Sequence, residues 1–164
     1  MREQLALLPE YGAAHFRLAL AALLCGVALS VPAGILAARI RWLEQPISAA
    51  ASIIQTVPSL ALLAIMVPLL SALDLPSIGF LPAFLGLVLY SMLPILRNTV
   101  TGIGSVDRAF IEAARGVGMT PRQELLCVVL PLVAPVIIAG IRTSAVWTVG
   151  MATLSTPEIG RAHV

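Results

Sequence analysis

Residues 107–131 read DRAFIEAARGVGMTPRQELLCVVLP and form the densest run of charge in an otherwise apolar chain. On a helix at about 100° per residue, Arg108, Glu112 and Arg115 share one face, where Glu112 can pair weakly with either arginine. The apolar residues form the opposite stripe: Val106, Ala109, Phe110, Ala113, Ala114 and Val117. The pattern predicts a short amphipathic helix, although taken alone it is also typical of an ordinary surface helix.

The same run predicts where this helix begins and ends. Asp107 is a suitable N-cap or first-turn residue. Gly116 and Gly118 weaken continuation of the helix, and Thr120 followed by Pro121 suits a turn and a new helix start. We therefore expect a short helix, a turn and then a second helix that enters the next apolar run.

The chain is 59% hydrophobic and only 11% charged, with a mean hydropathy of +1.00. A soluble domain carries about 25% charged residues. The deficit leaves too little polar surface to cover a globule, so the expected solvent is a membrane. The net charge of +2 is small and gives no indication of nucleic-acid binding.

Hydropathy divides the chain into a polar lead-in at 1–17 and a membrane domain at 18–157. A helix needs about 20 apolar residues to cross the hydrocarbon core. The predicted fold is all-α and membrane-integral, with about five transmembrane helices, at 18–38, 47–73, 78–97, 125–141 and 143–157. The charged loop at 107–123 lies between the third and fourth of these spans.

Two groups of small or polar residues stand out within the spans. Gly26, Ser30 and Gly34 are spaced four residues apart and present a small face for close helix packing. A second group is the candidate lining of a translocation path, with helix-to-helix hydrogen bonding as an equally weighted alternative. Its members are Gln55, Thr56 and Ser59 beside Pro58, together with Tyr90.

The arginines predict the orientation. Arg39 and Arg41 are separated by two predicted spans from the charged loop of Arg108, Arg115 and Arg122, so both loops lie on one side of the membrane. Positive residues favour the cytoplasmic side. We expect a multi-pass membrane protein with the N-terminus outside and the charged loop in the cytoplasm.

The sequence has no catalytic constellation. His15 and His163 are isolated, and neither a Walker-type phosphate loop nor a Cys/His metal spacing is present. The expectation is a protein that is not an enzyme and binds no cofactor.

The charged loop also matches a spaced pattern. Glu112-Ala113-Ala114, Gly118, Val128 and Leu130-Pro131 stand at the intervals of the EAA loop found in ATP-binding-cassette (ABC) importer permeases. That family's pattern reads Glu-Ala-Ala, three residues, Gly, nine residues, Ile, one residue and Leu-Pro, and this sequence departs from it only in having valine for isoleucine. The chain thus resembles the permease subunit of a type I, binding-protein-dependent ABC importer.

Three further segments resemble the osmoprotectant branch of that family, namely residues 55–63, 90–99 and 140–143. The resemblance implies import of glycine betaine, carnitine or choline. It also implies the type I permease fold, like that of the methionine permease, and a place in the bacterial cytoplasmic (inner) membrane. The implied partners are two copies of an ABC ATPase, a second permease chain (identical or not) and an extracytoplasmic substrate-binding protein. ATP is then used by the ATPase subunit.

The resemblance also implies how the loop works. Its helix docks in a groove of the ATPase, and it transmits the movement of the ATPase to the transmembrane helices. We expect the apolar stripe to pack on the permease's own bundle and the charged face, with Ile111, to meet the ATPase. The glycines then allow the turn and a close approach. The expected coupling residues are Arg108, Ile111, Glu112, Ala113, Ala114, Arg115 and Gly118.

The end of the chain departs from the family, because the apolar run breaks into residues 158–164, which we interpret as a non-native tail on a C-terminally truncated chain. The last helix would then be incomplete. The cargo is the least determined property, because the few aromatic residues form no visible cage for a quaternary amine. Alternatives are an ABC permease for an amino acid, a sulfonate or another small solute, and a small membrane scaffold protein.

Overall fold

The computed structural model describes residues 2–40, 42–43, 45–46, 49, 52–53, 59–77 and 79–152. Every regular element in these residues is helical. The labelled helices are α1 (Arg2–Arg39), α3 (Ser59–Ala72), α4 (Phe80–Gly104), α5 (Arg108–Gly116), α6 (Pro121–Gln123), the π-helix η1 (Glu124–Val129) and α7 (Leu130–Ala152). The predicted path residues Gln55 and Thr56 and the predicted tail at 158–164 lie outside the described residues.

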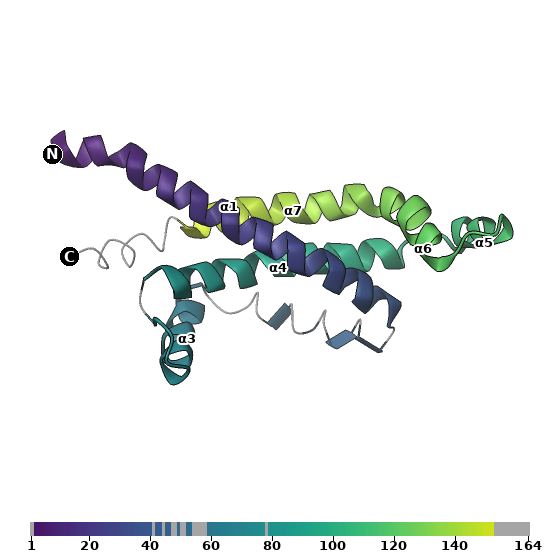
Figure 1. The fold of residues 1–164 in the computed structure, drawn as a ribbon, viewed down its shortest axis with the longest axis horizontal. Coiled ribbons are helices and arrows are strands. Elements are labelled where there is room, and N and C mark those ends of the chain that lie inside the picture. The colour runs from purple at the N-terminus through teal and green to yellow at the C-terminus, as the bar shows by residue number, and fades with distance from the viewer. Residues whose placement is uncertain are drawn as a thin grey trace.

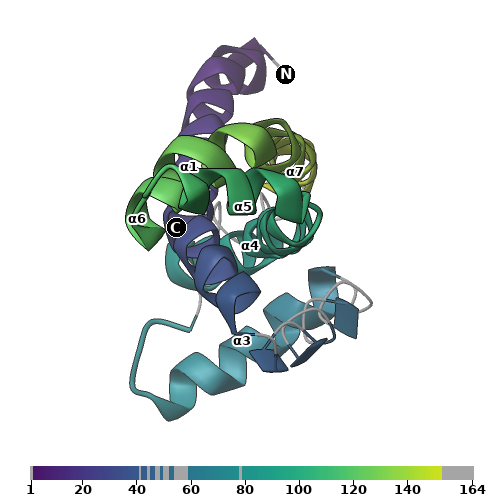
Figure 2. The same cartoon turned by 90° about the vertical axis from the view of Figure 1, so that its right-hand side faces the viewer.

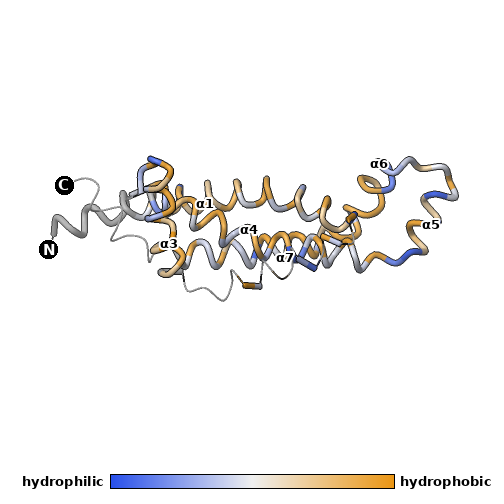
Figure 3. Tube along the Cα trace, turned by 90° about the horizontal axis from the view of Figure 1, so that it is seen from below, coloured by the Kyte–Doolittle hydropathy of each residue, from blue (hydrophilic) through white to orange (hydrophobic). Residues whose placement is uncertain are grey.

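Three helices form an elongated bundle, in which α1 and α4 run parallel and α7 runs antiparallel to both (Figure 1). The short helices α5 and α6 lie at one end of the bundle, and α3 lies beside the opposite end of α4 (Figures 1 and 2). Within the described residues, three helical segments are long and apolar enough to cross a membrane, namely His15–Arg39, Phe80–Gly104 and Pro121–Gly150. Apolar residues predominate along the bundle, whereas polar residues gather around α5 (Figure 3).

Small residues let α1 and α4 approach closely, as predicted from the spacing of Gly26, Ser30 and Gly34. A Cβ atom on Gly34 would lie 2.8 Å from Cβ of Thr99, and one on Gly26 would overlap the Ser91 hydroxyl. Ser30, between them, is fully buried. In a bilayer, helices gain little from the hydrophobic effect when they associate, so this close contact supplies much of the attraction.

Serine side chains link the three long helices at one level. The buried Ser91 hydroxyl of α4 donates to the carbonyl of Val88, at 2.8 Å, and contacts the carbonyl of Ala22 in α1, at 3.3 Å. The Ser144 hydroxyl of α7 donates to the carbonyl of Ser91. We call Gly26, Ser91 and Ser144 the three-helix junction.

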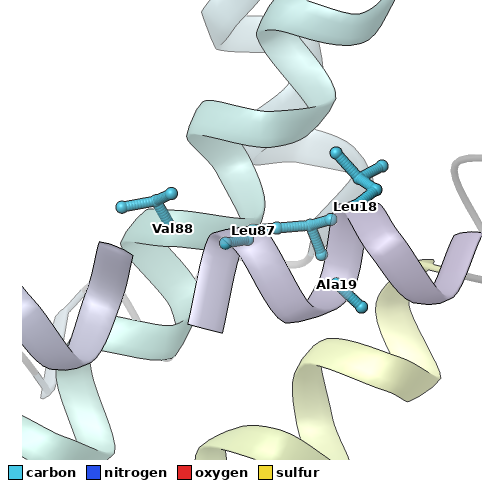
Figure 4. Close-up of a cluster of buried hydrophobic side chains, with 5 residues drawn as sticks. Leu18, Ala19, Leu87 and Val88 are labelled. Atoms are coloured by element: carbon cyan, nitrogen blue, oxygen red, sulfur yellow. The ribbon is translucent and has the colours of Figure 1, made fainter. Parts of the chain in front are cut away.

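An apolar cluster continues this packing along α1 and α4. It consists of Leu18, Ala19 and Ala22 from α1 with Leu87 and Val88 from α4 (Figure 4). Cys25, Phe84 and Met92 pack around it. These contacts fix α1 against the half of α4 that lies away from α5.

The prediction of two separate spans around Arg142 is wrong, because α7 passes through this residue without interruption. A single arginine ends an apolar run in a hydropathy profile, but it removes no backbone donor and does not break a helix. The helices also extend beyond two other predicted limits: α1 begins at Arg2, in the predicted lead-in, and α4 continues past Arg97 to Gly104.

A π-helical turn, η1, precedes α7 and was not predicted. Its last hydrogen bond joins the Leu130 amide to the carbonyl of Leu125, five residues earlier. The next residue, Pro131, has no amide hydrogen, and in a regular α-helix its ring would crowd the carbonyl four residues before it. The wider turn places an irregular hydrogen-bond pattern where the proline already interrupts the regular one.

Substitution of Gly34 by alanine should destabilise the bundle by about 1–3 kcal/mol, because the new methyl group meets the β-branched carbon of Thr99 and neither backbone can withdraw freely. Thermal unfolding in detergent measures the loss. Gly104→Ala is the matched control, since a Cβ there meets nothing within 4 Å. Equal melting temperatures for the two variants would contradict the close-packing interpretation.

Candidate functional site

The candidate site is the end of the bundle that carries α5 (Figure 2). Asp107 caps this helix as predicted: one carboxylate oxygen accepts a hydrogen bond from the Ala109 amide at 3.0 Å. The cap satisfies an amide that has no partner within the helix, and its negative charge suits the helix N-terminus. A short, exposed helix is thereby fixed at its first turn.

A Schellman motif ends α5 at Gly118. The Gly118 amide donates to the carbonyl of Arg115 at 2.9 Å, and the Met119 amide donates to that of Ala114 at 3.1 Å. Gly118 has φ +83°, a left-handed conformation that favours glycine. A Cβ on Gly118 would meet nothing within 4 Å in this chain, and the predicted close approach toward the ATPase stays a prediction. The residue is required by its backbone conformation.

The chain then turns directly into the next helix. Thr120 and Gln123 form a capping box, in which the Thr120 amide donates to Gln123 Oε1 at 2.9 Å and the Gln123 amide donates to the threonine hydroxyl at 3.4 Å. Pro121 occupies the first helical position, as predicted. Only the three residues of α6 lie between this turn and η1, so the connection from α5 to α7 is short.

An ion pair joins α5 to η1 across this turn. The Arg115 Nε donates to a carboxylate oxygen of Glu124 at 2.8 Å. This hydrogen bond raises the pKa of the Arg115 guanidinium, with a smaller contribution from Glu112. The predicted weak pairing of Arg115 with Glu112 is therefore secondary to a contact with Glu124. The side chain of Glu124 is mostly covered, whereas that of Arg115 is largely open to solvent.

A groove of about 280 Å³ lies between α5 and the bundle. Ile103 at the end of α4, Ile111 of α5 and Val129 of η1 line its apolar part, and Arg39 at the end of α1 lines it together with Arg115 and Glu124. Arg39 and the charged loop thus share one end of the bundle, as the spacing of the arginines predicts. Residues of α1, α4 and η1, the turn that leads into α7, therefore meet at this groove.

The predicted orientation of α5 is wrong. Ala114 is buried and Ile111 is half-buried against the groove, but Phe110 is 52% exposed and Val117 is 75% exposed. Most of the apolar stripe therefore faces away from the bundle, with Ala113 also exposed. Amphipathicity indicates two faces but not which of them is covered by the chain's own residues. We call Phe110, Ala113 and Val117 the outer face of α5.

The structure brings all seven predicted coupling residues together on α5 and its C-terminal turn. Arg108 and Glu112 are exposed, and among the described residues neither forms a hydrogen bond or ion pair. Ile111 and Arg115 line the chain's own groove and Ala114 is buried, whereas Ala113 is exposed. The role of these residues toward an ATPase stays a prediction.

Of the four path candidates, the structure describes the backbone position of Ser59 and the whole of Tyr90. Ser59 is the first residue of α3, and the side chain of Tyr90 is buried within the bundle beside Ser91. Their role in translocation also stays a prediction.

Sequence reasoning missed Glu124 and Arg39 at this site. Glu124 follows Pro121 as the acidic residue of a new helix, which is a recognisable first-turn pattern. The ion pair between Glu124 and Arg115 could not be predicted from the sequence, because the two residues lie on different helices joined by a left-handed turn. Arg39 joins the groove only through the packing of α1.

A model of the family described as binding-protein-dependent transport system inner membrane component matches residues 30–156. The choline transport permease OpuBB of Bacillus subtilis is 45% identical over 87% of this chain and 63% of its own length. The glycine betaine/carnitine/choline permease OpuCB of the same organism is 40% identical over the same shares of the two chains. The osmoprotectant import permease OsmW of Salmonella typhimurium is 44% identical over 83% of this chain and 64% of its own length. The chain thus spans less than two thirds of these relatives.

Solved structures show the same fold. The inward-facing methionine ABC transporter MetNI aligns with a TM-score of 0.82 over 94% of this chain and 76% of that chain, at 22% identity. An amino acid ABC transporter aligns with a TM-score of 0.74 at 19% identity, over 98% of this chain and 78% of its own. At these identities the likeness shows the type I permease fold alone, which confirms the predicted fold class.

Substitution of Gly118 by alanine should cost about 1–2 kcal/mol locally, because an L-residue resists the left-handed conformation that the Schellman motif requires. Faster hydrogen exchange at the amides of residues 118 and 119 reports the loss. Gly116→Ala is the matched control: it lies within α5 with open space around it, so alanine should leave these amides protected. Equal exchange in both variants would contradict a conformational requirement at Gly118.

Proposed function

Because this chain belongs to the family of binding-protein-dependent transport system inner membrane components, we propose that it is the membrane-spanning permease subunit of an ATP-driven importer. The observation that carries the proposal is α5, a capped amphipathic helix held at one end of an apolar three-helix bundle with its apolar outer face uncovered. Such a face is suited to a groove of another protein.

We propose an osmoprotectant as the cargo: glycine betaine, carnitine, choline or a related small quaternary amine. Support comes from the relatives, whose names describe choline, carnitine, glycine betaine and osmoprotectant permeases. An amino acid cargo is less favoured, because it rests on structures below 25% identity. A scaffold role is less favoured because of the family match.

The proposed partners are an ABC ATPase in two copies, a second permease chain and an extracytoplasmic substrate-binding protein. The chain itself binds no cofactor in this proposal, and ATP is used by the ATPase. The proposed orientation places α5 and Arg39 in the cytoplasm, because the arginines of that end favour the inner side. The N-terminus is then outside.

Coupling would proceed through the contacts around α5. The ATPase holds the outer face, so closure of the ATPase pair displaces α5 as a short rigid body. The Schellman turn, the capping box and the ion pair between Arg115 and Glu124 pass this displacement to η1 and α7. The groove side of α5, through Ile111, passes it to the end of α4.

Uptake by cells tests the function. The gene product that carries this chain, expressed with its ATPase and binding protein in cells that lack other uptake systems for quaternary amines, should import labelled glycine betaine, carnitine or choline. The control is an ATPase variant without its phosphate-loop lysine, which should abolish import. Uptake of an amino acid or a sulfonate alone would reject the osmoprotectant proposal, and uptake of no solute would reject transport.

Phe110→Ser should weaken association with the ATPase by roughly tenfold, because an aromatic anchor is lost from the interface, whereas the permease loses only the internal contacts of a side chain that is 52% exposed. Co-purification in detergent at graded salt measures the association, and transport-coupled ATP hydrolysis should fall in parallel. Leu75→Ser is the matched control, because Leu75 is an exposed leucine in the turn between α3 and the start of α4, away from α5. A similar effect of both substitutions would exclude a specific role for the outer face.

A further inference from the structure

Arg142 lies near the middle of the bundle. On the inner side of α7, Gly140 packs against the carbonyl of Pro94, and Ser144 donates to the carbonyl of Ser91. Arg142 stands between these two contacts. Since α4 extends from Phe80 to Gly104, its residues 91–94 are central, so Arg142 is level with the centre of α4.

The side chain of Arg142 is exposed on the outer side of α7. Among the described residues it makes no hydrogen bond and no ion pair. Its helix is strongly apolar on both sides of it. A guanidinium at this depth is costly in hydrocarbon, so residues of this kind face a water-filled cavity, a partner or a ligand.

An open groove of about 550 Å³ runs along this side of α7. Arg142 and Trp147 line it together with Thr143 and the apolar residues Pro135, Ile138 and Val146. Trp147 lies five positions after Arg142, which is about 7.5 Å along a helix axis. The groove therefore presents a cation and an aromatic ring, with apolar residues on both sides of Arg142 along α7.

We propose that this groove borders the path of the cargo and binds a small zwitterion, with Arg142 on the carboxylate and Trp147 on the quaternary ammonium. A guanidinium binds a carboxylate through charge-assisted hydrogen bonds, and an indole face attracts a quaternary ammonium. This inference rests on the proposed function and deepens it. The groove favours carboxylate-bearing amines such as glycine betaine and carnitine over choline, which has no carboxylate and is repelled by the guanidinium.

The test compares maximal uptake rates of glycine betaine and choline in the complete transporter. Rates are taken at saturating cargo, so that affinity of the binding protein does not decide the result. Arg142→Gln should lower the ratio of glycine betaine to choline uptake by about tenfold, which corresponds to the loss of one charge-assisted contact. Arg142→Lys should retain part of the preference, because it keeps the charge without the planar fork.

One control and one further variant distinguish recognition of the cargo from a purely structural role of Arg142. Arg97→Gln removes an exposed arginine nearer the α5 end of α4 and should leave the ratio unchanged. Trp147→Leu should slow both cargos together, because both carry the quaternary ammonium. Membrane abundance and ATPase co-purification are measured for every variant.

Three outcomes would overturn the inference. One is an equal fall of both uptake rates in Arg142→Gln, as expected if Arg142 pairs with an acidic residue of another chain. Another is an unchanged ratio in that variant, as expected if the groove holds a lipid headgroup. The third is a wild-type transporter that imports choline but not glycine betaine. A wild-type transporter that imports neither cargo would instead reject the proposed function.

Discussion

The rest of this structure depends on the three-helix junction of Gly26, Ser91 and Ser144. In water, apolar faces drive helices together, but inside a bilayer the lipid is as apolar as the side chains. Close backbone approach and satisfied hydroxyl groups must then supply the attraction. At the junction, the absence of a side chain on Gly26 leaves room for the Ser91 hydroxyl. The carbonyl of Ser91 accepts a hydrogen bond from the Ser144 hydroxyl. This contact fixes the positions of α1, α4 and α7 relative to one another along the long axis of the bundle, which we call their level.

The placement of α5 follows from that level. Since α4 and α7 are fixed against each other, the segment that joins them must turn at a defined height outside the bundle. A capped start at Asp107, a left-handed turn at Gly118 and a capping box at Thr120 fit this short connection. The result is a helix that cannot move far without moving α4 or α7. Its exposed outer face is apolar, which suits binding to another protein.

The same level also determines the environment of Arg142. The inner side of α7, with Gly140 and Ser144, is used for packing on α4, so residues spaced between them face outward. An arginine in that outward row stands at mid-depth with no described partner. One side of α7 therefore packs on α4, and the other side lines the groove that holds Arg142 and Trp147. The α5 end of the bundle and this groove are separate features, connected by η1 and α7.

The sequence by itself determined the membrane class, the existence of a short capped helix between Asp107 and Gly118, and the small face of α1, because composition, capping residues and spacing act locally. The family match also followed from a spaced motif. Only the tertiary structure decided that Phe110 and Val117 face outward, that Arg115 pairs with Glu124, and that α7 continues through Arg142 to leave it at mid-depth. Each of these depends on which surfaces other helices cover. A periodic pattern reports that a helix has two faces, but the choice between them is made by residues far away in the chain.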